Sequence, residues 1–364
     1  MGLRLDNKKT VIAVLFAGVF FALSLYRAYV RPAYVQAAAV EQSIATSFDE
    51  ERRLPLTIVR QQDPPFVKWK RDDLEIPLPE GVTRNDLVVE NHWTTGEIRV
   101  HFARGAGASY LEEVIHADEE KVLSGTLVPD GADGMVLCFE TDRVYEVTSH
   151  YETDTSGTSV LSLHFTPPQE LYDKVVVIDP AGDGEDAAGE NGALTGKDVA
   201  LSIAEIVRDR FEDRIKETGV KVYLTRSWDE TVSDAARVAL AEAVDADLYL
   251  RIGVTEDETR AGIAVTYNEV YFARGLNNAA FADMTLRHVA VATGCKAAGL
   301  YPAYGEDAIL TALTIPAANV SVGALSSDED AGRLSEDNDL RRAADGIYKA
   351  VLEAAERVSV YPSP

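Results

Sequence analysis

The pattern of apolar and polar positions changes twice along this chain of 364 residues. Near the start, the basic segment MGLRLDNKK is followed by an uncharged run of seventeen residues, TVIAVLFAGVFFALSLY. From about residue 76 to 166, apolar positions alternate with polar ones, and from residue 174 they form continuous runs and helical stripes. These patterns predict a membrane-spanning helix, a β-rich domain and an α/β domain, in that order.

The N-terminal pattern predicts a cytoplasmic stub at residues 1–9 and a transmembrane anchor at residues 10–30. A helix of seventeen residues is about 25 Å long, slightly shorter than a hydrocarbon core of roughly 30 Å, and flanking Lys9 and Arg27 can extend to the interfaces. A cleaved signal peptide is the alternative, but RAYVRPAYV separates the apolar run from the small residues at 36–40. In both cases we expect the rest of the chain outside the cytoplasm, held by a single-pass anchor in the first.

Two regions of different character precede residue 174. Residues 31–75 combine proline, charge and weak periodicity, which predicts a stalk or linker. The short runs GEIRVHF, GMVLCFE, RVYEVTSHY and TSVLSLHF predict a small β-sandwich over residues 76–168. Five of the six histidines lie there on separate segments without ligand spacing, so we expect each to be hydrogen-bonded individually or exposed: His92, His101, His116, His150 and His164.

Strand and helix patterns alternate over residues 174–358. KVVVIDP, VKVYLTR, DLYLRIG, GIAVTYN and ANVSVGAL predict strands. Apolar stripes predict helices in GKDVALSIAEIVRDRFEDRIKETG and TVSDAARVALAEAVDA, and at roughly 273–293 and 336–357. This alternation predicts an α/β domain whose mostly parallel sheet is flanked by helices.

Charge and cysteine content narrow the function. A net charge of −25 argues against nucleic acid as a partner, because phosphates would be repelled. Cys138 and Cys295 fall in different predicted domains, which excludes a disulfide framework, and they are too few for a zinc knuckle.

The glycine-rich acidic loop AGDGEDAAGENGALTG follows the first strand of the α/β domain, where ligands of such sheets bind. Gly182, Gly184 and Ala187 match the GxGxxA spacing of dinucleotide-binding loops. However, further glycines delay the start of the helix, and the acidic side chains would surround a pyrophosphate with negative charge. Dinucleotide binding is therefore disfavoured.

Five motifs in the same order resemble the zinc-dependent N-acetylmuramoyl-L-alanine amidases of bacterial cell walls, the family with the AmiC-like catalytic domain (Amidase_3 type). The family strings VVIDPGHGG, G…EKDVNL and KVYLTR..D are matched by VVVIDPAGDG, GALTGKDVAL and KVYLTRSWDE. The strings R…AN…ADLFISIHAN and PAVLVExGFLSN are matched by RVALAEAVDADLYLRIGVT and PAANVSVGALSSDED. The resemblance covers roughly residues 174–357 and implies the amidase fold. By its position alone, the β-rich domain resembles the AMIN-type wall-targeting modules of such proteins.

The resemblance also places the family's zinc site, and this chain lacks its side chains there. The two zinc-binding histidines fall on Gly182 and Gly253, the zinc-binding glutamate on Gly196, and the catalytic glutamate on Ser321. Zinc hydrolysis needs three protein ligands, an open position for water and a carboxylate base. We therefore predict a degenerate member of the family, with no zinc cofactor and no catalytic residue.

Three polar residues remain near these positions and are predicted to line a residual groove: Asp179, Asp183 and Arg251. The leading hypothesis is an extracytoplasmic pseudo-amidase that binds peptidoglycan or a partner protein of wall remodelling, division or sporulation. One alternative is an active amidase that cleaves the muramoyl–L-alanine bond, with Asp179 and Asp183 as substitute metal ligands. Another is a structural envelope protein without a binding site in the α/β domain.

Overall fold

The computed structural model describes most of the chain from residue 53 onward. The described residues are 53–60, 73–102, 114–118, 120–130, 134–153, 159–184, 186–192, 194–269 and 275–358. The predicted stub, the predicted anchor and most of the predicted stalk lie outside them. Within these ranges, no helix is long and apolar enough to cross a membrane.

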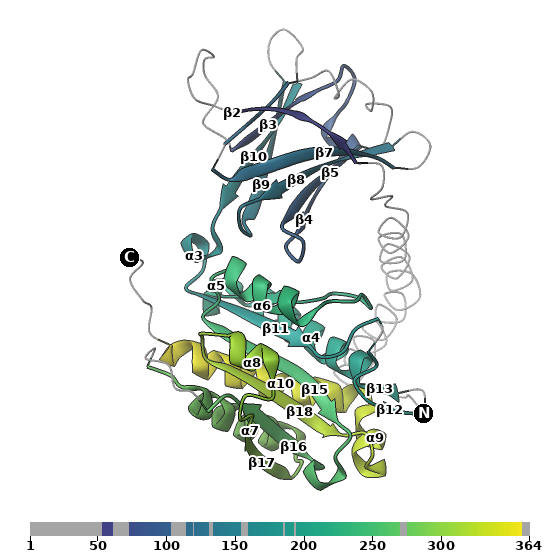
Figure 1. Cartoon of the computed structure of the whole chain (residues 1–364), viewed down its shortest axis with the longest axis vertical. Helices are drawn as coiled ribbons and strands as arrows, with labels where there is room; N and C mark the ends of the chain where they lie inside the picture. The colour runs from purple at the N-terminus through teal and green to yellow at the C-terminus, as the bar shows by residue number, and fades with distance from the viewer. Residues whose placement is uncertain are drawn as a thin grey trace, which may run out of the picture.

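The N-terminal domain consists of two five-stranded sheets, with the orders β1-β7-β8-β5-β4 and β2-β6-β3-β10-β9 (Figure 1). The strands are β1 (Leu54–Pro55), β2 (Thr57–Arg60), β3 (Leu74–Leu78), β4 (Leu87–His92), β5 (Glu97–Phe102), β6 (Val114–Ala117), β7 (Val122–Asp130), β8 (Gly134–Thr141), β9 (Glu146–Thr153) and β10 (Ser159–Thr166). Alternate residues such as Ile76, Val100 and Leu163 are fully buried between the sheets, as the alternating pattern predicts.

The sandwich begins earlier than residue 76. Strands β1 and β2 lie in the segment predicted as a stalk, and Leu56 and Ile58 pack against the core between the sheets. The proline and charged residues around these strands hide a pattern too short to stand out in the sequence. The first strands of the domain are thus fixed by pairing with β7 and β6.

The C-terminal domain is built on a six-stranded sheet in the order β14-β11-β15-β18-β16-β17. Its strands are β11 (Lys174–Pro180), β14 (Val220–Leu224), β15 (Leu248–Thr255), β16 (Ile263–Tyr267), β17 (Ala297–Pro302) and β18 (Ala317–Ala324). Only the pairing of β16 with β18 is antiparallel. The prediction of a mostly parallel α/β sheet is confirmed.

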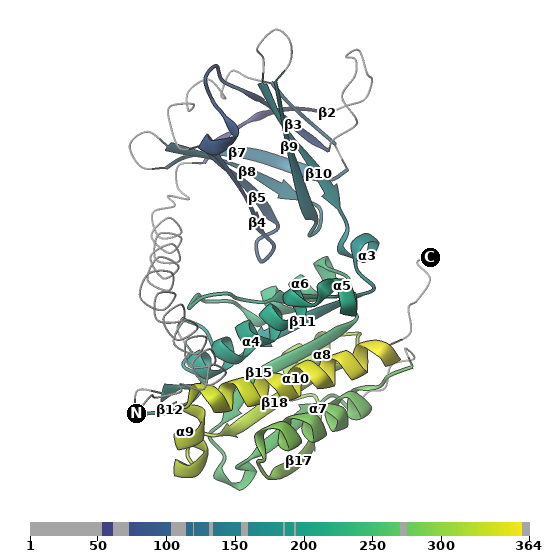
Figure 2. The ribbon, with the colours of Figure 1, turned by 180° about the vertical axis from the view of Figure 1, so that it is seen from behind.

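Helices cover both faces of this sheet. One face packs against α4 (Gly196–Asp213), α7 (Asn278–Thr293) and α10 (Asp337–Arg357), which Figure 2 shows in front of the strands. The other face packs against α6 (Asp234–Ala243) and α8 (Ala308–Ala312). We call these the α4 face and the α6 face.

The apolar stripe predicted for the first helix is buried in α4, at Val199, Ile203, Val207 and Phe211. The helix ends at Asp213, and Ile215 begins the separate short helix α5 (Ile215–Thr218). The third helix begins at Asn278, where the side chain of Asn277 caps it, rather than near 273. Sequence reasoning missed β17, α8 and α9 (Asp328–Leu334), which are short and carry no clear periodicity.

The two domains are in contact beside β14. The indole Nε1 of Trp93, in the turn between β4 and β5, donates a hydrogen bond to the carbonyl of Leu224 at 3.0 Å. The carboxylate of Glu146 accepts a hydrogen bond from the Tyr223 hydroxyl at 2.5 Å and lies 3.4 Å from Lys221 Nζ. The β-sandwich therefore docks on the outer edge of the α/β sheet.

Candidate functional site

The site predicted from the sequence lies where β11 ends and the loop to α4 begins. This loop contains the short hairpin of β12 (Glu190–Asn191) and β13 (Leu194–Thr195). It returns toward β11 before α4 starts, since the amide of Lys197 donates to the carbonyl of Ala187 at 2.9 Å. The loop therefore folds back over the carboxyl end of the sheet.

The four positions implied by the resemblance are close together. Gly253 and Ser321 are direct partners across β15 and β18. A Cβ placed on Gly182 would lie 2.9 Å from the Cβ of Lys197, which follows Gly196, and a Cβ on Gly196 would lie 2.7 Å from a methyl group of Val254. The fold therefore brings these four positions, from four separated motifs, close together.

The loop fills the space that ligand side chains would need. A Cβ on Gly196 would lie 1.9 Å from the carbonyl oxygen of Ala188, and one on Gly182 would lie 2.7 Å from that of Asp186. Gly182 also has φ +72°, a conformation that side chains other than glycine's rarely adopt. The residues present therefore do not fit a zinc ion, because glycine and serine at the four positions offer no imidazole or carboxylate, and at Gly182 and Gly196 there is no room for a ligand side chain.

Ser321 does not supply the missing chemistry. Its hydroxyl donates to the carbonyl of Gly323 at 3.1 Å, within its own strand. A neutral hydroxyl cannot take a proton from water as a carboxylate does.

Asp179 is the centre of a buried polar network at the end of β11. Its carboxylate is fully buried and accepts hydrogen bonds from the hydroxyls of Thr225 at 2.5 Å and Tyr249 at 2.7 Å. It also pairs with Arg237 Nη1, and Arg251 Nε lies 3.5 Å from its second oxygen. Burial by itself raises the pKa of Asp179, but the two guanidinium groups and the two hydroxyl donors outweigh burial and lower it. The carboxylate of Asp179 is therefore ionised and fully buried, so the prediction that it lines a groove is wrong.

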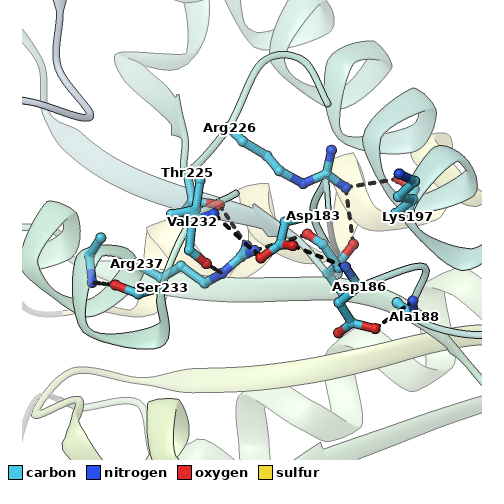
Figure 3. Close-up of polar contacts among 12 residues, drawn as sticks. Asp183, Asp186, Ala188, Lys197, Thr225, Arg226, Val232, Ser233 and Arg237 are labelled. Carbon is cyan, nitrogen blue, oxygen red and sulfur yellow. Dashed lines mark hydrogen bonds and ion pairs between the residues drawn. The ribbon is translucent and has the colours of Figure 1, made fainter. Parts of the chain in front are cut away.

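Two buried arginines hold the loop from beneath (Figure 3). Arg226 donates to the carbonyls of Pro180 at 3.1 Å, Ala181 at 3.0 Å and Lys197 at 2.8 Å. Arg237 donates to the carbonyl of Gly182 at 2.9 Å. Buried carbonyls left without hydrogen-bond partners would destabilise the fold. The hydrogen bonds from these two arginines therefore fix the path of the loop.

Sequence reasoning missed Arg226 and Arg237. A signal was present, because both stand in motifs that match the family. Arg226 ends KVYLTR, and Arg237 begins RVALAEAVDADLYLRIGVT. Charged residues within otherwise apolar segments are almost never buried unless paired. The loop carbonyls to which these arginines donate, however, are 29 to 55 residues away in sequence, and only the fold brings them together.

The other two predicted groove residues have different surroundings. Asp183 accepts from the amides of Asp186 at 3.1 Å and Val232 at 3.4 Å, so its carboxylate stabilises the loop. Arg251 is partly exposed and lines a cleft on the α6 face. His288, on α7, contacts the carboxylate of Glu353 at 2.5 Å and has no place in the site.

The histidines of the β-sandwich are not all separate. The Nε2 atoms of His92 and His101 lie 2.8 Å and 2.9 Å from the same oxygen of Glu90. These hydrogen bonds lower the pKa of Glu90. Across the described part of the chain, no group of three or more His, Cys, Asp or Glu side chains is arranged to hold a metal ion.

Comparison with known proteins finds matches for half of the chain. Residues 176–353 match the profile of a family described as Amidase_3, N-acetylmuramoyl-L-alanine amidase. The uncharacterized protein YqiI of Bacillus subtilis is 26% identical over 183 residues, which are 50% of this chain and 85% of that protein. The N-acetylmuramoyl-L-alanine amidase CwlM of Mycobacterium tuberculosis is 28% identical over 192 residues, which are 50% of this chain and 45% of that protein.

Among solved structures, the N-acetylmuramoyl-L-alanine amidase AmiC2 of Nostoc punctiforme is 27% identical, with a TM-score of 0.45. The match covers 51% of this chain and 98% of that one. The family profile lies within the α/β domain, and the β-sandwich precedes it.

Proposed function

Because residues 176–353 belong to the N-acetylmuramoyl-L-alanine amidase family, we propose that this chain is a pseudo-amidase. It binds peptidoglycan, or a protein that remodels the cell wall, and does not hydrolyse the muramoyl–L-alanine bond. The N-terminal apolar run holds it in the membrane, with the bulk of the chain outside the cytoplasm. The β-sandwich is an AMIN-like module that adds contacts to the wall.

One observation carries this proposal. The carbonyl of Ala188 stands where the first atom of a ligand side chain on Gly196 would be, at 1.9 Å. A binding site that had merely lost a side chain would keep room for it. Here the backbone has taken that room, which supports the proposal that this position no longer carries a zinc ligand.

The retained network supports binding rather than decay. Asp179, Arg226 and Arg237 still join the ends of β11 and β14 to the loop, although no ligand needs to be positioned there. Each of these groups would be costly if left unpaired. The chain thus keeps a rigid surface at the carboxyl end of the sheet, where α/β domains bind their ligands.

Metal content and hydrolysis test the proposal directly. The purified full-length protein is expected to contain no stoichiometric zinc by elemental mass spectrometry and to release no stem peptide from purified peptidoglycan. It is expected to sediment with that peptidoglycan or with the partner protein. An active amidase of the family, treated in parallel, controls for the substrate. One equivalent of tightly bound zinc would overturn the proposal, and a protein that sediments with neither would instead favour the structural role.

The geometry counts against an active enzyme with Asp179 and Asp183 as metal ligands. All the hydrogen-bonding capacity of Asp179 is directed at Thr225, Tyr249 and arginine groups, and its side chain is 0% exposed. Both oxygens of Asp183 accept amides of the chain. A metal would have to break these contacts before it could bind.

A further inference from the structure

A cleft of about 380 Å³ opens on the α6 face of the sheet, and the loss of the zinc site does not account for it. Its walls include Arg251 from β15, Arg260 before β16, Tyr301 from β17, Asp234 at the start of α6, and Glu306 and Asp307 before α8. This volume falls in the range of about 300–1,000 Å³ that is typical of small-molecule sites.

The cleft adjoins the vacated zinc site. Arg251 precedes Gly253 by two residues, so the two share a face of β15 and are separated by about 7 Å. The family string ADLFISIHAN has a serine at this position, where ADLYLRIGVT has arginine. A long cationic side chain is therefore a feature of this chain and not of the quoted family motif.

Arg251 presents unused donors to the cleft. Its Nε lies 3.5 Å from Asp179, and within the described part of the chain its two terminal nitrogens have no hydrogen-bond or ion-pair partner. Its side chain is 19% exposed, so these nitrogens reach the cleft without being freely solvated. Paired N–H groups of this geometry match the two oxygens of a carboxylate.

Arg251 is surrounded by carboxylates on both sides of the cleft. Asp179 lies beneath it, and Asp234 and Asp307 on the opposite wall also interact with its charge. A carboxylate bound to the terminal nitrogens of Arg251 would lie in a partly desolvated position, where an ion pair is stronger than in water.

The opposite wall of the cleft is acidic. Asp234, Glu306 and Asp307 line it, and among the described residues none of them lies within 4.0 Å of an Arg or Lys nitrogen. Arg260 does not neutralise them, because it pairs with Asp257 at 3.4 Å and stacks on the ring of Tyr301 at 4.1 Å. These carboxylates are placed to receive a cation.

We propose that this cleft binds an α-amino acid group that carries both a free carboxylate and a free ammonium, the first on Arg251 and the second on the acidic wall. A free amino acid has this chemistry, and so does a diamino acid in the stem peptide of a cell wall. In the second case the inference deepens the proposed function and rests on it.

Calorimetric titration of the purified full-length protein tests the chemistry with three matched probes. meso-Diaminopimelate has both groups, pimelate has only the carboxylates, and 1,5-diaminopentane has only the amines. We expect diaminopimelate to bind about tenfold or more tightly than either analogue, because each analogue lacks one of the two charged groups that the cleft would hydrogen-bond. Equal binding of pimelate, or no binding of diaminopimelate, would overturn the proposal.

Variants test the residues. Arg251→Ala is expected to weaken diaminopimelate binding by about tenfold or more, and Arg251→Lys by less, because it keeps the charge without the paired donors. Glu306→Gln, at the exposed rim, is expected to weaken diaminopimelate binding and leave pimelate binding unchanged. Arg287→Ala, on the exposed side of α7, is the control and should change neither. Unaltered diaminopimelate affinity in folded Arg251→Lys and Glu306→Gln would rule out these roles.

A further arm separates the two sources. An N-acetylmuramoyl tripeptide that ends in diaminopimelate is expected to bind more tightly than the free diamino acid if the wall is the source, and less tightly if a free amino acid is. Either order supports the cleft chemistry. If the Arg251 variants lose probe binding but still sediment with peptidoglycan, the proposed function is unaffected. The two proposals can therefore be contradicted independently.

Discussion

Replacing Asp179 by alanine is expected to lower the free energy of unfolding by about 3–5 kcal/mol, the usual cost of removing one partner of a buried ion pair. The change leaves the guanidinium of Arg237, which is 2% exposed, without its nearest carboxylate, since Asp183 is 3.8 Å away. It also removes the acceptor of the Thr225 and Tyr249 hydroxyls. Urea unfolding followed by circular dichroism measures the difference.

Two variants sharpen this experiment. Asp179→Asn keeps the shape and the acceptor oxygen but loses the charge, so we expect a loss smaller than that of alanine. Asp209→Ala is the matched control, because its carboxylate is 61% exposed and pairs with Arg208 on the surface. We expect it to change the stability by no more than about 0.5 kcal/mol. If Asp179→Ala were as mild as this control, the network would not be holding the loop.

The same carboxylate gives the stability a dependence on pH. The pKa of Asp179 is lowered in the folded chain, so the folded state favours the ionised form more than the unfolded state does. Its contribution is complete well above the unfolded value of about 3.9 and is lost as the pH falls through the lower folded pKa. The difference between wild type and Asp179→Asn should therefore be largest at neutral pH and shrink below about pH 4. A difference that grew in acid would contradict this sign.

Restoring the family's ligands is expected not to restore zinc binding. The combined variant Gly182→His, Gly196→Glu, Gly253→His and Ser321→Glu supplies all four side chains, but the loop occupies the space needed at Gly182 and Gly196. At Gly196, a contact of 1.9 Å with backbone cannot be relieved by a rotamer change. We expect Gly196→Glu alone to destabilise the protein by about 3 kcal/mol or more, at the upper end of what overpacking costs.

Single variants rank the positions. At Gly253 the nearest atom to an added Cβ is the Cβ of Ala181 at 3.1 Å, so Gly253→Ala should be milder than Gly196→Ala. Gly332→Ala, in α9, is the control glycine, because nothing lies within 4 Å of its added Cβ. It should be neutral or stabilising by up to about 1 kcal/mol. Stoichiometric zinc with hydrolysis of peptidoglycan in the combined variant would show that the loop opens, and would contradict the closed arrangement.

Much of the α/β domain could be predicted from local pattern. The runs around Val176 and Leu250 are strongly apolar, and the stripe of α4 repeats at helical spacing, so burial dictates their secondary structure. The early strands β1 and β2 could not be predicted in the same way. They are short, and their stability comes from pairing with distant strands and from a few contacts such as that of Ile58.

For the site, the colinear motifs imply the positions Gly182, Gly196, Gly253 and Ser321, and the fold brings these four residues together. The motifs did not indicate which polar contacts surround them. Asp179 and Asp183 were predicted to line a groove, yet their carboxylates are directed inward at arginines and amides. The direction of a polar side chain depends on partners far away in the chain, and no local pattern encodes it.

The sequence by itself determined the α/β class of the C-terminal domain and its family resemblance, because both depend on residue type and local spacing. Tertiary structure alone decided that the loop closes over the vacated positions, that two buried arginines hold it there, and that Arg251 faces a polar cleft. These features arise where segments distant in sequence meet. Their energies come from desolvation and close packing, which exist only once the chain is folded.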